Sequence, residues 1–224
     1  CSFYGMSECL GIGGCVIRNH ECLELEKWGS VGRPSLNSDL RIADSPDLAG
    51  DGKKQNEIGE IVVRSASFAN GNWGDPSWRS RALTSDGWYR TGDLGYIDGD
   101  GYVYLLGRAD NQITTGGMKV SAEEIEHVIE SNPDVSEAMV IGEPDEKWGE
   151  RIVAFVVPAE DSLTAEKLGA WCREDERLAG FKLPKKWYFL QELPQNGVGK
   201  RDRKKLKLLR EKLEVSKTIE WRDR

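Results

Sequence analysis

The sequence offers little to a metal ion or to disulfide chemistry. It contains two histidines, His20 and His127, and five cysteines, an odd number in which no two form a Cys-x-x-Cys pair. A zinc site, which needs clustered cysteine or histidine ligands, is therefore not expected. We expect the cysteines to be free thiols in a reducing compartment, which predicts a cytoplasmic protein.

An excess of positive charge and a long apolar run are also absent. The net charge of -7 argues against general binding to nucleic acid or to anionic membranes. Apolar runs such as residues 152–157 have the length of a strand, so no membrane span is expected. The chain starts at Cys1 rather than at an initiator methionine and has no leader-like segment. We therefore expect it to be a piece of a longer protein.

The remaining composition is that of a folded protein with a core. A hydrophobic content of 38% and a charged content of 31% are typical of globular proteins, and 224 residues suffice for one or two domains. Residues 1–109 are mostly β-forming, with turns rich in glycine and aspartate, which predicts a small barrel or a strongly bent sheet. The expected strands are residues 14–17, 40–43, 59–64, 94–97 and 102–105, the last two joined by a hairpin turn at residues 98–101.

Residues 110–224 have a different pattern, because strands and helices alternate as in a compact α+β domain. Ser121 and Glu124 form a capping box, which predicts a helix that begins after Ser121 and ends near Pro133. Thr164 is expected to begin a second helix. The other expected elements are strands at residues 135–141, 151–157 and 187–190 and a basic helix from near residue 202.

A carboxylate and a guanidinium flank the predicted hairpin turn at residues 98–101. Asp93 ends the run Trp-Tyr-Arg-Thr-Gly-Asp, and Arg108 lies in the run Gly-Arg-Ala-Asp. The carboxylate can accept both hydroxyls of a ribose, and the guanidinium can hold a hydroxyl and a phosphate oxygen at fixed geometry. The pair therefore indicates a nucleotide-binding site. A surface ion pair between neighbouring hairpin ends is the alternative.

Residues 4–8, Tyr-Gly-Met-Ser-Glu, gather several ligand-binding groups in a short segment. The aromatic ring of Tyr4 can stack on a purine, and Gly5 lets the backbone approach a ligand. Beside a phosphate, the Glu8 carboxylate would hold Mg²⁺, a cation that prefers oxygen ligands. An ordinary turn would account for the same residues.

A pair of glycines stands out in the second part of the chain. Gly116 and Gly117 lie in the run Thr-Thr-Gly-Gly-Met-Lys-Val, just before the predicted helix. There, backbone N–H groups can meet a ligand. A loop that merely needs positive φ is the alternative.

A lysine at the end of a glycine-flanked loop is the fourth candidate. Lys200 ends the run Leu-Pro-Gln-Asn-Gly-Val-Gly-Lys, and its ammonium group could neutralise charge on a carboxylate and on a pentavalent phosphorus. The alternative for residues 200–205 is a solvated basic helix face. We favour that alternative for Arg203, Lys204 and Lys205.

Taken in order, these segments closely resemble the motifs of the adenylate-forming superfamily, which comprises acyl- and aryl-CoA synthetases, luciferases and peptide-synthetase adenylation domains. Residues 4–8 resemble its Tyr-Gly-x-Thr-Glu motif, and residues 88–93 match Trp-x-x-Thr-Gly-Asp. Further similarities are residues 58–61 and 71–76 (Gly-Glu-Leu … Gly-Tyr-Trp-x-Asp-Pro), 107–126 (the hinge segment) and 199–200 (the catalytic-lysine loop). The resemblance covers residues 1 to about 210, essentially the whole chain.

The resemblance implies an α/β multi-domain fragment. Residues 1–109 would be the mostly-β, distorted-barrel end of a large N-terminal domain, and residues 110–224 a small, mobile α+β C-terminal domain. The implied activity has two steps: an acid attacks ATP to give acyl-AMP and pyrophosphate, and a thiol then displaces AMP. The implied cofactors and partners are ATP/AMP, Mg²⁺, coenzyme A and a carboxylic acid, with fatty acid metabolism as one setting and a homo-oligomer as a compatible assembly.

The resemblance also assigns roles by position. Glu8 would hold Mg²⁺, and Lys200 would serve adenylation only. Asp110 matches the hinge, while Gly116 and Gly117 match the segment beside the pantetheine thiol of CoA. The implied nucleotide-binding residues are Tyr4 in the adenine pocket, Gly5 next to it in the chain, Ser7 at phosphate, Asp93 at the ribose hydroxyls and Arg108 at ribose and phosphate.

The chain departs from the family pattern in three places. Ser7 replaces the usual threonine but keeps the hydroxyl, and Thr114 stands where luciferases and coumarate ligases have a lysine. The family's phosphate-binding loop lies upstream of the motif at residues 4–8, and nothing in this chain matches it. We therefore predict that these 224 residues alone do not adenylate an acid.

Two alternatives to a CoA synthetase remain. One is an adenylation domain that loads a carrier protein, and the other is a non-catalytic binding module. Residues 143–150, running into residues 151–155, look more like those of free-standing CoA ligases, which favours CoA as the thiol.

Overall fold

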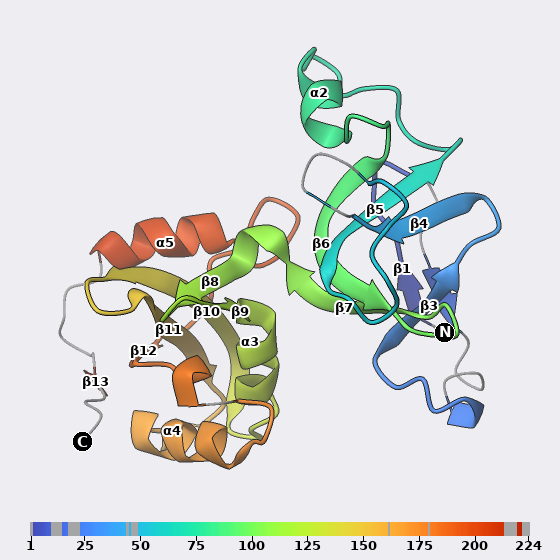
Figure 1. The fold of residues 1–224 in the computed structure, drawn as a ribbon. Coiled ribbons are helices and arrows are strands. Elements are labelled where there is room, and N and C mark those ends of the chain that lie inside the picture. The colour runs from blue at the N-terminus through green and yellow to red at the C-terminus, as the bar shows by residue number, and fades with distance from the viewer. Residues whose placement is uncertain are drawn as a thin grey trace. The chain divides into compact units, whose positions relative to one another are not determined.

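The computed structural model describes residues 2–9, 15–17, 23–43, 45, 49–160, 162–178, 180–212 and 219–220, with the backbone alone at 2–3, 15–16, 211–212 and 219–220 (Figure 1). The chain divides into two compact units, Cys1–Asp110 and Asn111–Arg224. Cys9 and Cys172 are buried free thiols. Cys1 and Cys22, the side chain of Cys15, His20 and the start of the strand expected at residues 14–17 lie outside the described parts.

Seven antiparallel strands form the sheet of the first unit, in the order β1-β2-β3-β7-β6-β5-β4. Figure 1 shows how strongly β6 curves. The expected strand-rich fold with a strongly bent sheet is therefore confirmed. The elements are β1 (Ser2–Tyr4), β2 (Cys15–Ile17), β3 (Ser30–Pro34), β4 (Ser38–Ile42), β5 (Gly59–Ser65), α2 (Trp78–Ala82), β6 (Tyr89–Ile97), β7 (Val103–Arg108) and the 3-10 turn η1 (Ala109–Asn111).

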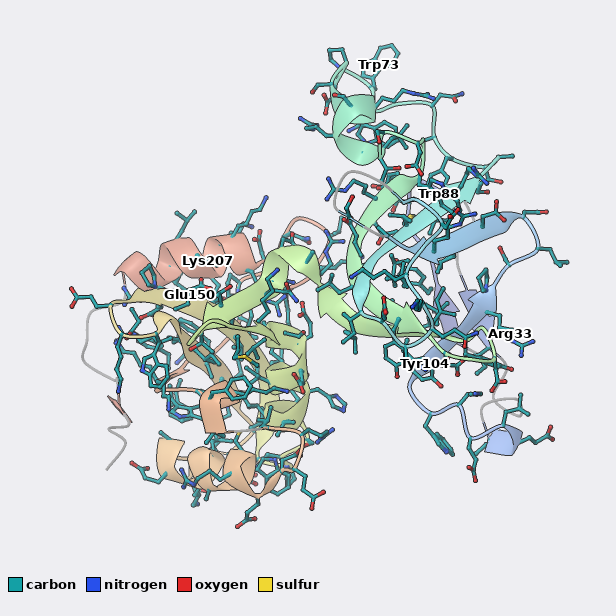
Figure 2. The ribbon with its side chains drawn as sticks, viewed as in Figure 1. Arg33, Trp73, Trp88, Tyr104, Glu150 and Lys207 are labelled. Atoms are coloured by element: carbon teal, nitrogen blue, oxygen red, sulfur yellow. The ribbon has the colours of Figure 1, made fainter. Side chains whose placement is uncertain are left out.

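Both faces of β5 are buried, because its side chains alternate between two clusters. Ile61 and Val63 are fully buried on one face, where Val103 of β7 packs against them. Val62 on the other face packs in a cluster with Trp88, which is 2% exposed (Figure 2). Each such aliphatic side chain contributes about 1.5–3 kcal/mol when fully buried. Burial on both faces thus holds β5 in place beside the start of β6.

The hairpin turn predicted at residues 98–101 is confirmed between β6 and β7. The Gly101 N–H donates to the Asp98 carbonyl (3.1 Å), and Gly101 has φ +81°, which glycine adopts without strain. The Asp98 carboxylate also accepts from the N–H groups of Asp100 and Tyr102. Both strands are longer than expected, because pairing continues to the register pair of Asp93 and Arg108.

The second unit is built on a sheet of order β13-β12-β11-β8-β9, with β10 paired to β11. The alternation of strands and helices expected for this part is confirmed. The elements are β8 (Gln112–Thr115), β9 (Met118–Ser121), α3 (Ala122–Glu130), β10 (Val135–Asp145), β11 (Gly149–Pro158), α4 (Ala165–Glu174), the 3-10 turn η2 (Gly180–Lys182), β12 (Lys186–Phe189), α5 (Arg203–Lys212) and β13 (Ile219–Glu220).

Side chains of β10 and β11 alternate between two hydrophobic clusters, so this sheet has a helical layer on each face. On one face Ala138 and Val140 belong to the cluster that includes α3 and α4. On the other face Met139 and Ile141 pack in a cluster with Leu206 of α5. Figure 1 shows α5 on the opposite side of the sheet from α4. The segment that precedes α5 is therefore held against β10.

The helix starts are close to those expected, but one capping arrangement is different. Ser121 is the N-cap residue of α3, yet its hydroxyl donates to Glu123 (2.9 Å) instead of capping the backbone. Glu124 pairs with Lys182 (2.6 Å), so the reciprocal bonds of a capping box do not form. Thr164 does cap α4, accepting from the Lys167 N–H. Among the described residues, no helix has the length and apolarity to cross a membrane.

Candidate functional site

Asp93 and Arg108 face each other across strands β6 and β7, on either side of the hairpin turn that they were expected to flank. The two residues are register partners, and Arg108 Nη1 donates to Asp93 Oδ1 (3.2 Å) and to the Thr91 carbonyl (3.0 Å). Their side chains are 21% and 47% exposed, so an ion pair of this kind adds little stability. The pair is therefore both a surface ion pair and a pair that a ligand can reach.

The backbone before Asp93 explains why the run is Thr-Gly-Asp. Gly92 has φ +72°, and a Cβ at this position would lie 2.9 Å from Nη2 of Arg108, so glycine alone fits without displacement. The Thr91 hydroxyl donates to the Ile61 carbonyl (2.7 Å) and accepts from the Asp93 N–H (3.0 Å). These contacts attach the backbone of Asp93 to the buried strand β5.

Tyr4, from the edge strand β1, contacts the same carboxylate. It is the last residue of β1, and its hydroxyl donates to Asp93 Oδ2 (2.6 Å). Its ring is partly buried against the hydrophobic cluster around Ile61. The structure thus brings together two of the predicted residues that are 89 positions apart.

A cavity of about 430 Å³ opens beside these residues. Four of the predicted site residues line it: Gly5, Glu8, Asp93 and Arg108. Ser7 does not; it is exposed in the turn that the Cys9 N–H closes on the Met6 carbonyl. Residues to which the sequence analysis gave no role complete the lining: Met6, Glu60, Arg81, Tyr89, Arg90, Thr91 and Gly92.

Some of these additional residues could have been identified from the sequence. Arg90 and Thr91 belong to the same motif as Asp93, and their proximity in the chain was a usable signal. Glu60 comes from β5, where it binds Arg90 through Nε (3.2 Å) and Nη2 (3.0 Å). Arg81 comes from α2, where it pairs with Asp75 (2.5 Å). Only the fold brings these last two residues to the cavity.

Glu8 interacts with Tyr89 at this cavity. Burial, the charge of Glu8 and a hydrogen bond with Glu8 raise the pKa of Tyr89 to about 12, so the phenol stays protonated and donates to the carboxylate. Within the described residues, no three histidine, cysteine or acidic side chains cluster as a metal site. Protein sites for Mg²⁺ often supply one or two carboxylates and leave the other positions to phosphate and water. Glu8 fits that donor set in the presence of a nucleotide.

Asp110, the predicted hinge residue, is the last residue of the first unit. Its carboxylate accepts from Arg108 Nε (3.2 Å). The guanidinium of Arg108 is therefore shared among Asp93, Thr91 and Asp110. The residue expected to bind ribose and phosphate is thus connected directly to the residue expected to be the hinge.

Gly116 and Gly117 form the two-residue turn of a β-hairpin between β8 and β9, where a loop before a helix was expected. Their φ values of +57° and +78° are those of a turn that glycine favours at both positions. The Gly116 N–H donates to the Trp148 carbonyl (2.8 Å), and a Cβ on Gly116 would lie 3.2 Å from the Trp148 ring. The turn is exposed, and Gly116 packs too closely on Trp148 to carry a side chain easily.

Lys200 is exposed at the end of a loop that Asn196 closes. The Asn196 side chain accepts from the N–H groups of Val198 and Lys200 (3.0 Å each), and the Asn196 N–H donates to the Lys200 carbonyl (2.8 Å). Gly199 has φ +76°. The backbone of Lys200 is therefore held in place, while its side chain extends into solvent. Lys200, Gly116 and Gly117 belong to the second unit, separately from the cavity residues.

The sequence pattern favoured a solvated basic helix face for Arg203, and the structure contradicts this. Its guanidinium binds both oxygens of Glu126 (2.5 Å each), and Glu126 is buried. Lys204 and Lys205 are exposed, as expected. The sequence interpretation failed at Arg203 because its partner lies 77 positions earlier in the chain.

Residues 124–200 match the family of AMP-binding enzyme C-terminal domains. Over 174 residues the chain is 40% identical to indoleacetate–CoA ligase of Aromatoleum aromaticum, a match covering 78% of this chain and 33% of the relative. The structure resembles o-succinylbenzoate CoA synthetase of Bacillus subtilis in complex with the acyl-adenylate intermediate OSB-AMP. The TM-score is 0.81 and the identity 33%, over 92% of this chain and 40% of that one.

The same Bacillus subtilis enzyme in complex with ATP and a magnesium ion gives a TM-score of 0.79 at 33% identity, over 92% of this chain and 41% of that one. The chain thus spans only about a third to two fifths of the enzymes it matches. Sequence similarity and fold similarity both extend over most of its own length. The chain therefore belongs to the adenylate-forming superfamily of acyl- and aryl-CoA synthetases, within which its residues 124–200 match the AMP-binding C-terminal domain.

Proposed function

We propose that this chain is part of an AMP-forming acid–thiol ligase. In the first step, a carboxylate oxygen of the acid attacks the α-phosphorus of ATP, and pyrophosphate leaves with the bonding electrons. In the second step, the sulfur of a thiol attacks the acyl carbon, and AMP leaves. The relatives' names support CoA as the thiol. They specify two different acids, so the acid substrate of this protein stays open.

The observation that carries the proposal is the set of contacts at Asp93. A carboxylate offers about four acceptor positions, of which Tyr4 and Arg108 use two. The remaining positions suit the two hydroxyls of a ribose, and the adjacent cavity has room for a nucleotide. Arg108 would then neutralise phosphate charge while it holds Asp93 in place.

The other cavity residues fit the same ligand. Gly5 would let the nucleotide approach the backbone, and Glu8 would hold Mg²⁺, whose chemistry is to draw charge from the phosphate oxygens. Tyr4, which contacts Asp93 but does not line the cavity, would border the adenine. Ser7 would reach phosphate only after a change in its turn, because it does not line the cavity. Arg81 and Arg90, both lining the cavity, add positive charge near the expected phosphates.

Residues 110–224 would act as the mobile C-terminal domain, and residues 1–109 as the end of the large domain. Asp110 would be the hinge about which the second part turns between the two steps, as closure motions do in many enzymes. Lys200 would stabilise charge in the adenylation step only, whereas Gly116 and Gly117 would lie beside the thiol in the second step. Lacking a phosphate-binding loop, the 224 residues alone would not adenylate an acid.

The nucleotide role is tested by comparing AMP with 2′,3′-dideoxy-AMP in an NMR titration of the 224-residue chain. Hydrogen bonds to a charged group contribute about 1.5–3 kcal/mol, so AMP should bind at least about tenfold more tightly. Asp93→Asn should remove most of that preference. Equal affinity of the wild-type chain for the two nucleotides would contradict the ribose role.

Asp39→Asn is a matched control for this experiment. Asp39 is on β4 of the same unit, its side chain is 66% exposed, and it pairs with Arg64 away from the cavity. The substitution removes the same charge and should leave the preference for AMP unchanged. If Asp39→Asn weakened AMP binding as much as Asp93→Asn, the effect would be one of overall charge rather than of a ribose site.

The second candidate function is loading of a carrier protein. It is tested with the enzyme whose chain includes these residues, by supplying acyl-AMP and either CoA or a carrier protein as the thiol. Faster consumption of CoA is expected. Consumption of the carrier alone would overturn the CoA assignment but leave the AMP site intact.

A further inference from the structure

The outer edge of β10 is covered by side chains rather than by another strand. Among the described strands, β10 pairs with β11 alone. Alternate residues of an antiparallel strand direct their N–H and C=O groups to opposite edges. On the edge away from β11, Ala138 and Val140 are two of the residues that present these groups, and each needs one donor and one acceptor from elsewhere in the protein.

Two glutamate–arginine pairs supply these partners. At Ala138, Glu130 accepts from the N–H (3.0 Å) and Arg201 donates to the carbonyl (2.9 Å). At Val140, Glu126 accepts from the N–H (2.6 Å) and Arg203 donates to the carbonyl (3.4 Å). Each pair is also joined internally, Arg201 to Glu130 at 2.6 Å and Arg203 to Glu126 at 2.5 Å. We call these four charged side chains the edge latch.

The spacing of the edge latch matches that of a missing strand. Glu126 and Glu130 are four residues apart on α3 and therefore lie on one face of the helix. Arg201 and Arg203 are two residues apart, the period at which a strand repeats its contacts. The inner pair is the more buried, with 10% and 21% of its side chains exposed, against 31% and 37% for the outer pair.

The edge latch begins at the residue after Lys200. On the other side of Lys200, Asn196 accepts from the Lys200 N–H and closes the loop. The backbone of Lys200 is therefore fixed from both sides. We propose that Arg201 and Arg203, through Glu130 and Glu126, are positioning residues that set where the Lys200 side chain leaves the second unit.

The edge latch also reaches the first residue of the second unit. Glu123 contacts Arg203 Nη1 (3.3 Å) and accepts from the side-chain amide of Asn111 (2.5 Å). Asn111 directly follows Asp110, the proposed hinge. The hinge-side end of the unit and the Lys200 loop are thus joined by one continuous network of polar side chains. A rotation at Asp110 would carry the lysine as part of a rigid body.

The catalytic part of this inference rests on the proposed function of Lys200, so its experiment has two readouts. Arg201→Met is the main variant, because the outer pair is partly exposed and its loss leaves a folded unit. Lys207→Met is the control: Lys207 is also a basic residue that follows Lys200 in the chain, but it is exposed on α5 (Figure 2). Both variants lose one positive charge.

The first readout is amide hydrogen exchange in the 224-residue chain. In Arg201→Met, exchange at the Lys200 and Val198 amides should accelerate by about fivefold or more, because the loop has lost its attachment to β10. In Lys207→Met it should not change. Unchanged exchange in Arg201→Met overturns the inference whatever Lys200 does in catalysis.

The second readout separates the two half-reactions in the enzyme whose chain includes these residues. Arg201→Met should slow adenylation by about tenfold to a hundredfold through misplacement of Lys200, while thioester formation from supplied acyl-AMP stays within about twofold. Arg201→Lys should recover part of the lost rate. Equal slowing of both steps would indicate a merely structural role and overturn the positioning role.

Lys200→Ala distinguishes failure of the inference from failure of the proposed function. If Lys200→Ala abolishes adenylation and Arg201→Met does not affect it, the edge latch has no positioning role and the proposed function stands. If Lys200→Ala leaves adenylation intact, the catalytic assignment of Lys200 is wrong. The hydrogen-exchange result then decides separately whether the edge latch holds the loop.

Discussion

The two units use the same pair of chemical groups in opposite ways. In the first unit, Asp93 and Arg108 are joined by one contact of 3.2 Å, and the side chain of Arg108 is 47% exposed. In the second unit, both oxygens of Glu126 are bound by Arg203 at 2.5 Å, and the side chain of Glu126 is 10% exposed. One pair lies at a cavity, and the other joins α3 to the first residue of α5.

The difference teaches which carboxylate–guanidinium pairs can bind a ligand. Asp93 keeps acceptor positions that face open space, so a ribose can complete its coordination. Glu126 has its two oxygens occupied by Arg203 and the Val140 N–H, so it has little capacity for a ligand. A pair with spare hydrogen-bonding capacity is suited to binding, whereas a saturated and buried pair is suited to holding the backbone.

The largest expected effect comes from breaking the buried pair. Arg203→Met leaves the Glu126 carboxylate buried without its cation and should destabilise the second unit by about 3–5 kcal/mol. Arg108→Met removes an accessible pair and should cost the first unit only about 0–1 kcal/mol. Urea unfolding, followed by NMR signals from each unit, measures both values. Equal losses would remove the distinction between the two pairs.

A second buried carboxylate extends the comparison to pH. Burial would raise the pKa of Glu143, but hydrogen bonds and charge from Arg210 and Arg151 outweigh it and hold the pKa below its usual 4.5. Because the folded pKa is the lower one, the stabilisation is present above pH 4.5 and is lost as the pH falls through the folded value.

Acidification from pH 6 to pH 3 should therefore lower the stability of the second unit through Glu143 by at most about 2 kcal/mol, because one proton changes the free energy of unfolding by about 1.4 kcal/mol per pH unit. The measurement is the urea midpoint of this unit as a function of pH. Glu143→Gln should flatten that profile and lower the stability at pH 6. Glu137→Gln, on the same strand, is the matched control. An unchanged profile in Glu143→Gln would mean that other carboxylates control the acid response.

Gly92, which lies against Arg108, allows a test of the accessible pair. Gly92→Ala introduces a Cβ at positive φ, within 2.9 Å of Arg108 Nη2. It should destabilise the first unit by about 1–3 kcal/mol and displace the guanidinium from Asp93. Gly101→Ala is the control for the cost of placing a side chain at positive φ, because Gly101 also has positive φ but has open space around it. AMP affinity is measured for both variants. If Gly92→Ala and Gly101→Ala weakened AMP binding equally, the contact between residue 92 and Arg108 would be unimportant for binding.

The smallest effect is expected at Tyr4. Tyr4→Phe removes the hydroxyl that donates to Asp93 Oδ2 and should weaken AMP binding by about 0.5–1.5 kcal/mol while the ring stays in place. An NMR titration with AMP gives the value. If Tyr4→Phe strengthened binding instead, the hydroxyl would be a competitor of the ribose rather than its neighbour.

The parts of the fold that were predictable from sequence are those that local chemistry determines. Asp98 and Gly101 carry the signature of a hairpin turn, and Thr164 that of a helix N-cap, because turns and caps depend on residues close in the chain. Gly116 and Gly117 carried a hairpin signature as well, but the helix that follows led to the expectation of a loop. Turn chemistry was the better guide there.

The site was predictable only in part for the same reason. Asp93 and Arg108 could be identified because both flank one hairpin. Glu60 and Arg81 could not, because strand pairing and a short helix bring them to the cavity. Arg203 was placed on a solvated face because a basic run gives no sign of a partner on a helix 77 positions away. The long-range partners of charged residues depend on the fold, so they cannot be predicted from the local sequence.

The side-chain cover on β10 has a consequence for the behaviour of many copies of this protein together. An uncovered strand edge is a template on which another chain can add a strand and begin to aggregate. Here the cover consists of four charged side chains, so a single substitution can uncover part of the edge. Variants of Arg201 and Arg203 are therefore expected to associate with one another at high concentration, even where each molecule stays folded.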